Sequence, residues 1–206
     1  FLTETSAHAD KIGEYIGLYA GHSTEFRETS SSGGLATFVS RELLRRGIVD
    51  YIVAVRESKG EDSHYEYGIL KGVNEVSQGS QTKYYPVTLA DVIRNIKDLD
   101  GNVAVSGIPC FVKGLRLAQK KDLVLNAKVK FVIGIICGGL KSRLYTDYLG
   151  DNVGVAKSSI LNPKYRIKDF KSNASDYSFG CTDKLTSHEK KIKMRTLGDM
   201  WGTGRF

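Results

Sequence analysis

The fold is decided by the stretch Val-Ala-Val-Ser-Gly-Ile-Pro-Cys at residues 103–110. Its first residues form an apolar run, which is typical of a strand buried on both faces of a parallel sheet, and a helical pattern follows Pro109. Two similar runs, rich in β-branched residues, lie at residues 51–55 and 130–136, and helical patterns separate the three. Strands that alternate with helices indicate an α/β fold. We therefore predict a mostly parallel central sheet flanked by helices.

The remaining patterns are weaker. Apolar residues recur at helical spacing after Gly34 and after Thr88, which predicts two helices before residue 103. One short strand is predicted at residues 15–19 and another around residues 65–70. Short antiparallel strands are predicted between residues 153 and 179, followed by a basic, Gly-rich tail over residues 190–206. We expect an α/β ligand-binding domain at residues 1–150 and a small irregular or antiparallel C-terminal extension at residues 151–206.

Composition narrows the classes of function. The chain has 206 residues, 41% of them hydrophobic, which is enough to bury a core and excludes wholesale disorder. We expect no membrane span, because no apolar run approaches the roughly 20 residues that one needs, and no signal peptide is visible. Three cysteines, an odd number, favour a reducing compartment and a cytoplasmic location. The net charge of +7 suits anionic partners, but the positive charges are scattered without interleaved aromatic residues, so no nucleic-acid partner is predicted.

Three loops could carry chemistry, because ligands of open α/β sheets bind at the carboxyl ends of the strands. The first is Ser31-Ser32-Gly33-Gly34, just before a predicted helix. Hydroxyl groups, free amides at a helix start and glycines that let a ligand approach the backbone would make a phosphate cradle. Two glycines are also an ordinary entry to a helix, and the GxGxxG and Walker spacings are absent. Both interpretations stay open.

The second and third loops contain cysteines. Gly107-Ile108-Pro109-Cys110 and Cys137-Gly138-Gly139 each follow an apolar strand. A cysteine at a helix start has a lowered thiol pKa and can serve as nucleophile, redox thiol or cluster ligand, whereas most free cysteines are small buried hydrophobic residues. The four histidines have no partner at metal-ligand spacing, and no motif supports a hydrolase.

Short motifs follow one another along nearly the whole chain. They are Ser-Ser-Gly-Gly-Leu-Ala-Thr (31–37), Lys83-Tyr84, Gly-Ile-Pro-Cys (107–110) with Gly114-Leu115-Arg116, Cys-Gly-Gly (137–139) with Lys141-Ser142, Tyr-Ser-Phe-Gly-Cys (177–181) and Met-Trp-Gly-Thr-Gly (200–204). Their combination resembles the family of coenzyme F420 hydrogenase/dehydrogenase beta subunits, particularly bacterial members linked to surface-polysaccharide gene clusters. The order and spacing of the motifs make the resemblance specific.

This resemblance implies an iron–sulfur flavoprotein that passes electrons between a 4Fe–4S cluster, FAD and a soluble acceptor, such as a deazaflavin coenzyme or a ferredoxin-type carrier, or a redox partner protein. The residues expected to bind FAD are Ser31, Ser32, Gly33, Gly34, Lys83, Gly107, Pro109, Gly138, Gly139 and Lys141. Cys110 and Cys137 match cluster-ligand positions, and Cys181 is either a third ligand or a buried structural thiol.

Such a cluster normally takes four thiolates, and family chains continue after residue 204 into a Cys-rich segment. The expectation is therefore a truncated chain, with the cluster present in the intact protein and absent from this fragment. Two alternatives stay open: a cluster-free family member acting in exopolysaccharide biosynthesis, and a non-catalytic ligand-binding or interaction subunit. The oligomeric state is left open too. We expect the loops at 31–34 and 107–110 to share one pocket, and the sulfurs of Cys110 and Cys137 to lie within about 8 Å of each other.

Overall fold

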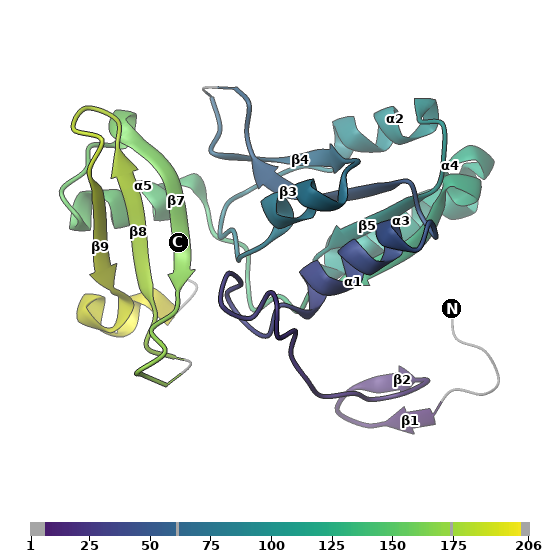
Figure 1. Ribbon diagram of the computed structural model, residues 1–206, viewed down its shortest axis with the longest axis horizontal. Helices are drawn as coiled ribbons and strands as arrows, with labels where there is room; N and C mark the ends of the chain where they lie inside the picture. The colour runs from purple at the N-terminus through teal and green to yellow at the C-terminus, as the bar shows by residue number, and fades with distance from the viewer. Residues whose placement is uncertain (1–6, 61, 174, 203–206) are drawn as a thin grey trace.

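A computed structural model describes residues 7–60, 62–173 and 175–202 (Figure 1). Its main feature is a four-stranded sheet in the order β4-β3-β5-β6, called the central sheet below. The strands are β3 (Tyr51–Glu57), β4 (Tyr65–Leu70), β5 (Val103–Gly107) and β6 (Val129–Gly134). β3 pairs in parallel with β5, and β5 with β6, so the predicted parallel arrangement of the three apolar runs is confirmed.

The fourth strand makes the sheet mixed. β4 pairs antiparallel with β3, with Ile52 opposite Leu70 and Glu57 opposite Tyr65. Only residues 58–64 connect the two strands, and a parallel pair would need a crossover of a dozen or more residues. The direction of β4 therefore follows from the length of its connection.

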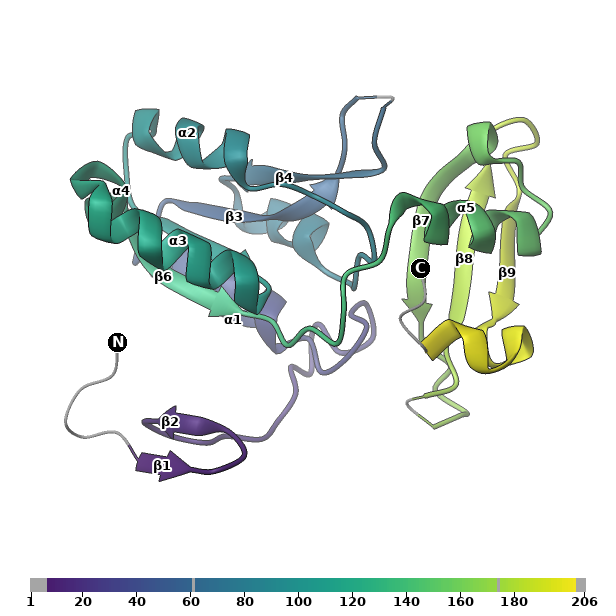
Figure 2. The ribbon, with the colours of Figure 1, turned by 180° about the vertical axis from the view of Figure 1, so that it is seen from behind.

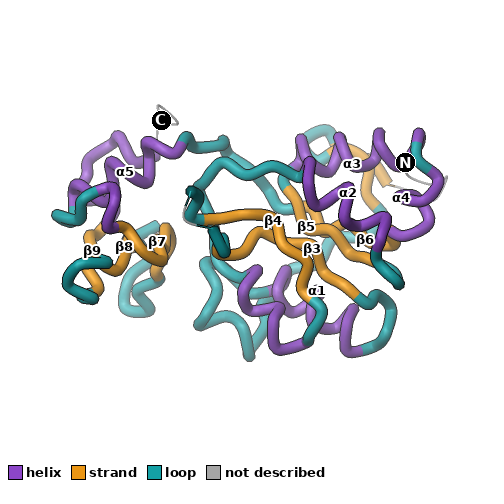
Figure 3. The backbone as a smooth tube through the Cα atoms, turned by 90° about the horizontal axis from the view of Figure 1, so that it is seen from above, coloured by secondary structure: helices purple, strands orange, loops and turns teal. Residues whose placement is uncertain are grey.

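Helices cover both faces of the central sheet, as Figure 3 shows. Helix α1 (Leu35–Arg45) lies on one face, where Leu43 packs with Ile52, Ala54 and Ala104. Helices α2 (Ala90–Asp98), α3 (Pro109–Lys121) and α4 (Leu123–Lys128) cover the other face, over Val53, Val103 and Val105. Because neighbouring strand residues point to opposite covered faces, the strands read as continuous apolar runs.

A second, antiparallel sheet follows, called the C-terminal sheet below, in the order β7-β8-β9. It consists of β7 (Ile160–Ile167), β8 (Ser178–Asp183) and β9 (Glu189–Lys193), and α5 (Arg143–Asn152) lies along one of its faces (Figure 2). Short 3-10 helices lie at Val73–Gly79, Lys157–Ser159 and Met194–Gly202. The antiparallel extension is confirmed. The tail predicted from residue 190 is wrong as far as residue 202, because Ile192 turns toward the core and makes β9 part of the sheet, while residues 203–206 lie outside the described residues.

One core joins the two sheets. Tyr65 and Tyr85 of the central part are buried together with Tyr145, Tyr165 and Phe179 of the C-terminal part. The ring of Tyr165 lies 5.8–6.4 Å from four other aromatic rings, and its hydroxyl is 2.7 Å from the Thr146 hydroxyl. The hydroxyl of Tyr65 donates to the carbonyl of Pro163. The group Tyr65, Tyr84, Tyr85, Tyr145 and Tyr165 is called the tyrosine cluster below.

The N-terminal region differs from its prediction. The strands there are β1 (Ala7–Ala9) and β2 (Gly13–Tyr15), which form a two-stranded hairpin. Ile16, Leu18 and Tyr19 are exposed and lie outside both strands, so the expected strand at residues 15–19 is wrong beyond Tyr15. Its apolar residues have no sheet to pack against. Within residues 7–202, apart from positions 61 and 174, no helix has the length and apolar character needed to cross a bilayer.

Candidate functional site

The loops after β5 and β6 begin at the carboxyl edge of the central sheet. Ala36, Thr37 and Ser40 of α1 line a small recess together with Ser106 of β5 and Ile135, which follows β6. The N–H of Ile135 donates to the carbonyl oxygen of Gly107 at 2.9 Å, so the loops after β5 and β6 start side by side. Helices α1, α3 and α5 each begin without a hydrogen bond from the side chain of the N-cap residue.

The loop at 31–34 is tied to the segment around Lys83. The N–H of Thr82 donates to Ser31 Oγ at 2.9 Å, and the hydroxyls of Ser30 and Ser80 are 3.0 Å apart. Ser30 and Ser31 are buried. The Ser31 hydroxyl therefore holds two segments of the chain together, which is a structural task that the sequence pattern did not indicate.

The two glycines of this loop are explained largely by packing. Gly34 has φ +77°, and a Cβ placed on it would lie 2.8 Å from the backbone of Phe26. A Cβ on Gly33 would lie 3.3 Å from the carbonyl oxygen of Gly21. The carbonyl of Ser32 accepts from Lys168 Nζ at 2.7 Å. These contacts favour the interpretation of the loop as a tightly packed helix entry, and its binding of a phosphate stays a prediction.

Lys83 and Lys141, both predicted to bind a cofactor, have different surroundings. Lys83 Nζ donates to the carbonyl oxygens of Gln78, at 3.2 Å, and Ser80. The ring of the next residue, Tyr84, lies 6.4 Å from that of Tyr145, and Lys141 Nζ lies 5.4 Å from the centre of the Tyr145 ring. Lys141 therefore lies against one ring of the tyrosine cluster, whereas backbone carbonyl groups hold the Lys83 ammonium.

Burial perturbs Lys83. It lowers the pKa of the Lys83 ammonium from 10.5 to about 8, and the charge of Glu57 only partly opposes the shift. A lysine with such a pKa can hold or release a proton near neutral pH, which is a common property of functional sites.

The lowered pKa predicts a pH dependence of stability. Between about pH 8 and pH 10 the unfolded chain keeps the proton that folded Lys83 releases, so this residue's contribution to the free energy of unfolding rises with pH. Relative to a Lys83→Met variant, the wild type is expected to gain about 2 kcal/mol over that range. Urea unfolding at several pH values measures the difference, and an exposed Lys171→Met variant serves as control. A constant difference between wild type and Lys83→Met would contradict the lowered pKa.

The loop at 137–141 is open. A Cβ placed on Gly138 or Gly139 would meet no atom within 4 Å, and Gly139 has φ +151°. Cys137 is half-buried. A ligand could therefore approach this stretch of backbone closely, which keeps the predicted role of the two glycines in binding.

The loop at 107–110 leads into α3. Pro109 is the first residue of the helix and Cys110, the second, is exposed. Tyr67 donates to the carbonyl of Ser106 at 3.1 Å, and a Cβ on Gly107 would lie 3.5 Å from the same hydroxyl. Pro109 also lines an apolar groove of about 620 Å³ along α3 and the residues after β6. The sharing of one pocket by this loop and the loop at 31–34, and the closeness of Cys110 and Cys137, stay predictions.

The described residues do not fit an iron–sulfur cluster by themselves. Cys181 lies in β8, 1% exposed, within the core of the C-terminal sheet, and burial raises the pKa of its thiol. A protonated, buried thiol is a poor metal ligand. No group of three or more His, Cys, Asp or Glu side chains suited to a metal ion occurs among the residues that the structure describes.

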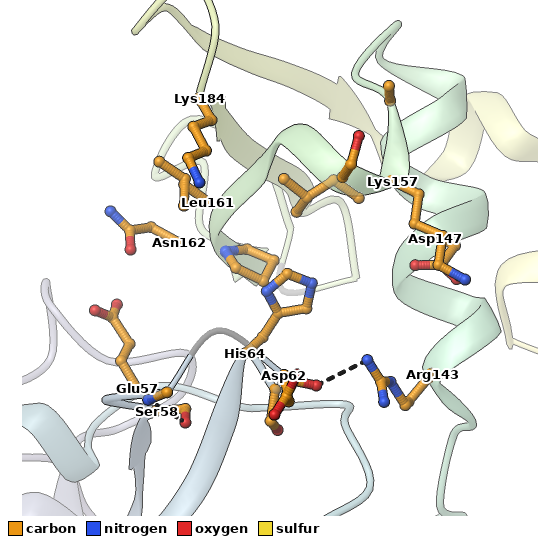
Figure 4. Close-up of a pocket in the computed structure, with 16 residues that line it drawn as sticks. Glu57, Ser58, Asp62, His64, Arg143, Asp147, Lys157, Leu161, Asn162 and Lys184 are labelled. Atoms are coloured by element: carbon orange, nitrogen blue, oxygen red, sulfur yellow. Dashed lines mark hydrogen bonds and ion pairs between the residues drawn. The ribbon is translucent and has the colours of Figure 1, made fainter.

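A larger cleft, which the sequence did not indicate, lies between the end of β3 and the C-terminal sheet. Its volume is about 710 Å³. Figure 4 shows the His64 ring pointing into it, with Asn162 and Lys184 on one side and Arg143 and Asp147 on the other. Arg143 donates to the Asp62 carbonyl at 2.9 Å. Burial lowers the pKa of His64, which keeps the imidazole neutral at pH 7. None of the predicted site residues lines this cleft, whose walls come from segments far apart in sequence.

Two family models match the chain. The model of the N-terminal part of the coenzyme F420 hydrogenase/dehydrogenase beta subunit matches residues 18–94, and the model of its C-terminal part matches residues 100–200. The division between them falls between α2 and β5, so the strands of the one central sheet come from both parts.

Known proteins agree with these matches. One component of the F420H2 dehydrogenase of Methanosarcina mazei is 25% identical over 108 residues, which are 52% of this chain and 30% of that protein. A chain of the F420-reducing NiFe hydrogenase complex of Methanosarcina barkeri has a TM-score of 0.61 at 16% identity, over 87% of this chain and 62% of that one. The second likeness shows a shared fold. This chain spans about a third of the curated relative and under two thirds of the solved chain.

Proposed function

Because the chain belongs to the family of coenzyme F420 hydrogenase/dehydrogenase beta subunits, we propose that it is an FAD-dependent electron-transfer subunit whose cofactor lies at the carboxyl edge of the central sheet. The family is one of oxidoreductase subunits. The relatives named above are a component of a dehydrogenase and a chain of a hydrogenase complex. The binding of FAD, its place on the chain and the partners are the proposal.

One arrangement carries this proposal: Lys141 lies over the Tyr145 ring, and the same loop carries the open backbone of Gly138 and Gly139. A placed cation beside a stretch of backbone that a ligand can approach closely suits a cofactor that bears phosphates. The residues present therefore fit a flavin dinucleotide.

FAD would supply the redox chemistry, because it can accept a hydride or single electrons. The chain's own residues bind and orient it. Lys83 can hold a proton or release it near neutral pH, and its positive charge favours an anionic neighbour. The partner that we propose is a redox partner protein or a soluble carrier of the deazaflavin or ferredoxin type.

The 4Fe–4S cluster has no part in this proposal. Of the described cysteines, Cys110 and Cys137 follow the carboxyl ends of neighbouring strands, and Cys181 is buried elsewhere. Four thiolates are normally required, so a cluster would depend on ligands from outside the described residues.

A leucine at position 138 tests the site. Gly138→Leu is expected to weaken FAD binding at least about tenfold, because the new side chain fills space that the proposal gives to the cofactor. Its thermal stability should stay close to that of the wild type, since a Cβ there meets no protein atom. Titration of the purified apoprotein with FAD, followed by flavin fluorescence, measures the effect.

Gly72→Leu is the matched control. Gly72 follows β4 at the opposite edge of the central sheet, and a Cβ there would meet only the Glu75 side chain, at 3.6 Å. It should bind FAD as the wild type does. Equal affinities of the two variants would remove the 137–141 loop from the site, and a wild-type protein that binds no FAD would overturn the proposed function.

A further inference from the structure

A basic pocket lies between the C-terminal sheet and the loop that precedes α1. Lys164 and Arg166 are alternate residues of β7 and Lys168 follows the strand at the same spacing, so extended backbone turns the three side chains to one side. Lys164, Arg166 and Lys168 all line the pocket. Lys191 of β9 joins them, because Lys164 and Lys191 both pair with Gly180 of the strand between.

The positive charge of this pocket is only partly neutralised. Two carboxylates line it, Glu28 and Glu189, against four cations. Glu189 lies 4.0 Å from Lys164 and 3.4 Å from Lys191. In the part of the chain that the structure describes, no ion pair involves Arg166 or Lys168. A surplus of positive charge in a confined space attracts an anion.

Arg166 is held in place with a donor unused. Its guanidinium lies 4.9 Å from the centre of the Tyr177 ring, which fixes its plane. Its Nε is buried and has no hydrogen-bond partner among the described residues. A buried unsatisfied N–H is costly and needs an explanation, of which a missing ligand is one. Lys168 also indicates a surplus of positive charge. Burial is the main cause that lowers the pKa of its ammonium, and the positive charges of Arg27 and Arg166 lower it further.

The other wall of the pocket comes from Thr29, Ser30 and Gln81. Each of them lies within two residues of Ser31 or Lys83, which are predicted to bind the cofactor. The cavity measures about 160 Å³, well below the roughly 300 Å³ at which pockets begin to hold drug-sized molecules. It therefore has room for a charged group and not for a ring system.

We propose that this basic pocket is a phosphate-binding subsite, in which Arg166, Lys164 and Lys191 hold the pyrophosphate arm of a nucleotide. The assignment to the arm of FAD rests on the proposed function. The binding of a phosphate group rests on the pocket alone, and the two can be tested separately.

The experiment compares three probes on the purified chain: inorganic pyrophosphate, FAD and riboflavin, which lacks phosphate. Arg166→Gln is expected to weaken pyrophosphate binding, measured by calorimetry, about 10- to 100-fold, the usual effect of losing a hydrogen bond to a charged group. FAD binding should weaken by a similar factor and riboflavin binding should not change. Arg166→Lys should recover part of the loss, because a cation remains. Lys171→Gln removes the same charge from an exposed position outside the pocket and should leave every affinity within about twofold.

Each outcome decides. Equal pyrophosphate affinities of wild type and Arg166→Gln, or equal losses in Arg166→Gln and Lys171→Gln, would overturn the subsite. If Arg166→Gln bound FAD as tightly as the wild type does, the assignment of the pocket to FAD would be overturned, while the proposed function would stand. Pyrophosphate binding that depends on Arg166, in a chain that binds no FAD, would keep the subsite and reject the cofactor. Circular dichroism checks folding, and Lys164→Gln repeats the test if Arg166→Gln does not fold.

Discussion

Replacing Phe179 with alanine is expected to lower the free energy of unfolding by about 3–5 kcal/mol, the usual cost of removing a buried phenyl ring. Phe179 is the second residue of β8 and is 0% exposed. Its ring is 5.8 Å from that of Tyr165, in the core that joins the two sheets. The cavity would therefore weaken the C-terminal sheet and its attachment to the central sheet together. Denaturant unfolding followed by far-UV circular dichroism measures the loss.

Phe170→Ala is the matched control. The Phe170 side chain is 66% exposed, and its ring centre lies 5.6 Å from Lys168 Nζ. We expect this change to cost less than about 1 kcal/mol. If both variants lost less than about 1 kcal/mol of unfolding free energy, the assignment of Phe179 to a shared core would be wrong. A single cooperative transition in the wild type is also expected, because one core serves both sheets.

Gly34→Ala is expected to lower the free energy of unfolding by about 2–5 kcal/mol. The left-handed backbone at φ +77° costs a non-glycine residue about 1–2 kcal/mol, and crowding in a packed site typically adds about 1–3 kcal/mol. The crowding comes from the backbone of Phe26, which lies 2.8 Å from the new methyl group. A backbone cannot move aside as a flexible side chain would.

Gly47→Ala separates the two causes. Gly47 has φ +63°, and a Cβ there would meet no atom within 4 Å, so only the conformational cost of about 1–2 kcal/mol is expected. Thermal or urea unfolding of both variants measures the difference. Equal losses would show that Phe26 moves aside, and would reopen Gly34 as a residue kept for ligand approach.

The sequence predicted what local patterns encode. The runs at 51–55, 103–107 and 130–136 became neighbouring parallel strands, because burial on both faces demands continuous apolar residues. The direction of β4 depends on its short connection to β3, which periodicity does not report. β9 was missed because four of its five residues are charged, and only Ile192 reaches the core.

The candidate site was less accessible to prediction. Ser31 was expected at a cofactor, yet its hydroxyl accepts from Thr82, a partner 51 residues away that no local pattern specifies. The cleft at His64 depends on Asp62 meeting Arg143 across 81 residues. The basic pocket at Arg166 forms where β7 lies beside the loop at 28–31. In the sequence its cations are indistinguishable from scattered surface charges.

The tyrosine cluster has a consequence for biosynthesis. Tyr65 and Pro163, which are in contact, are 98 residues apart. All four strands of the central sheet lie before residue 135, whereas residues buried together with Tyr65 and Tyr85 come from α5, β7 and β8, the last of which ends at Asp183. A ribosome adding about 5–20 residues per second needs several seconds to cover that interval. During this time the growing chain displays tyrosines that the finished protein buries, and they form the surface that a chaperone at the ribosome would meet first.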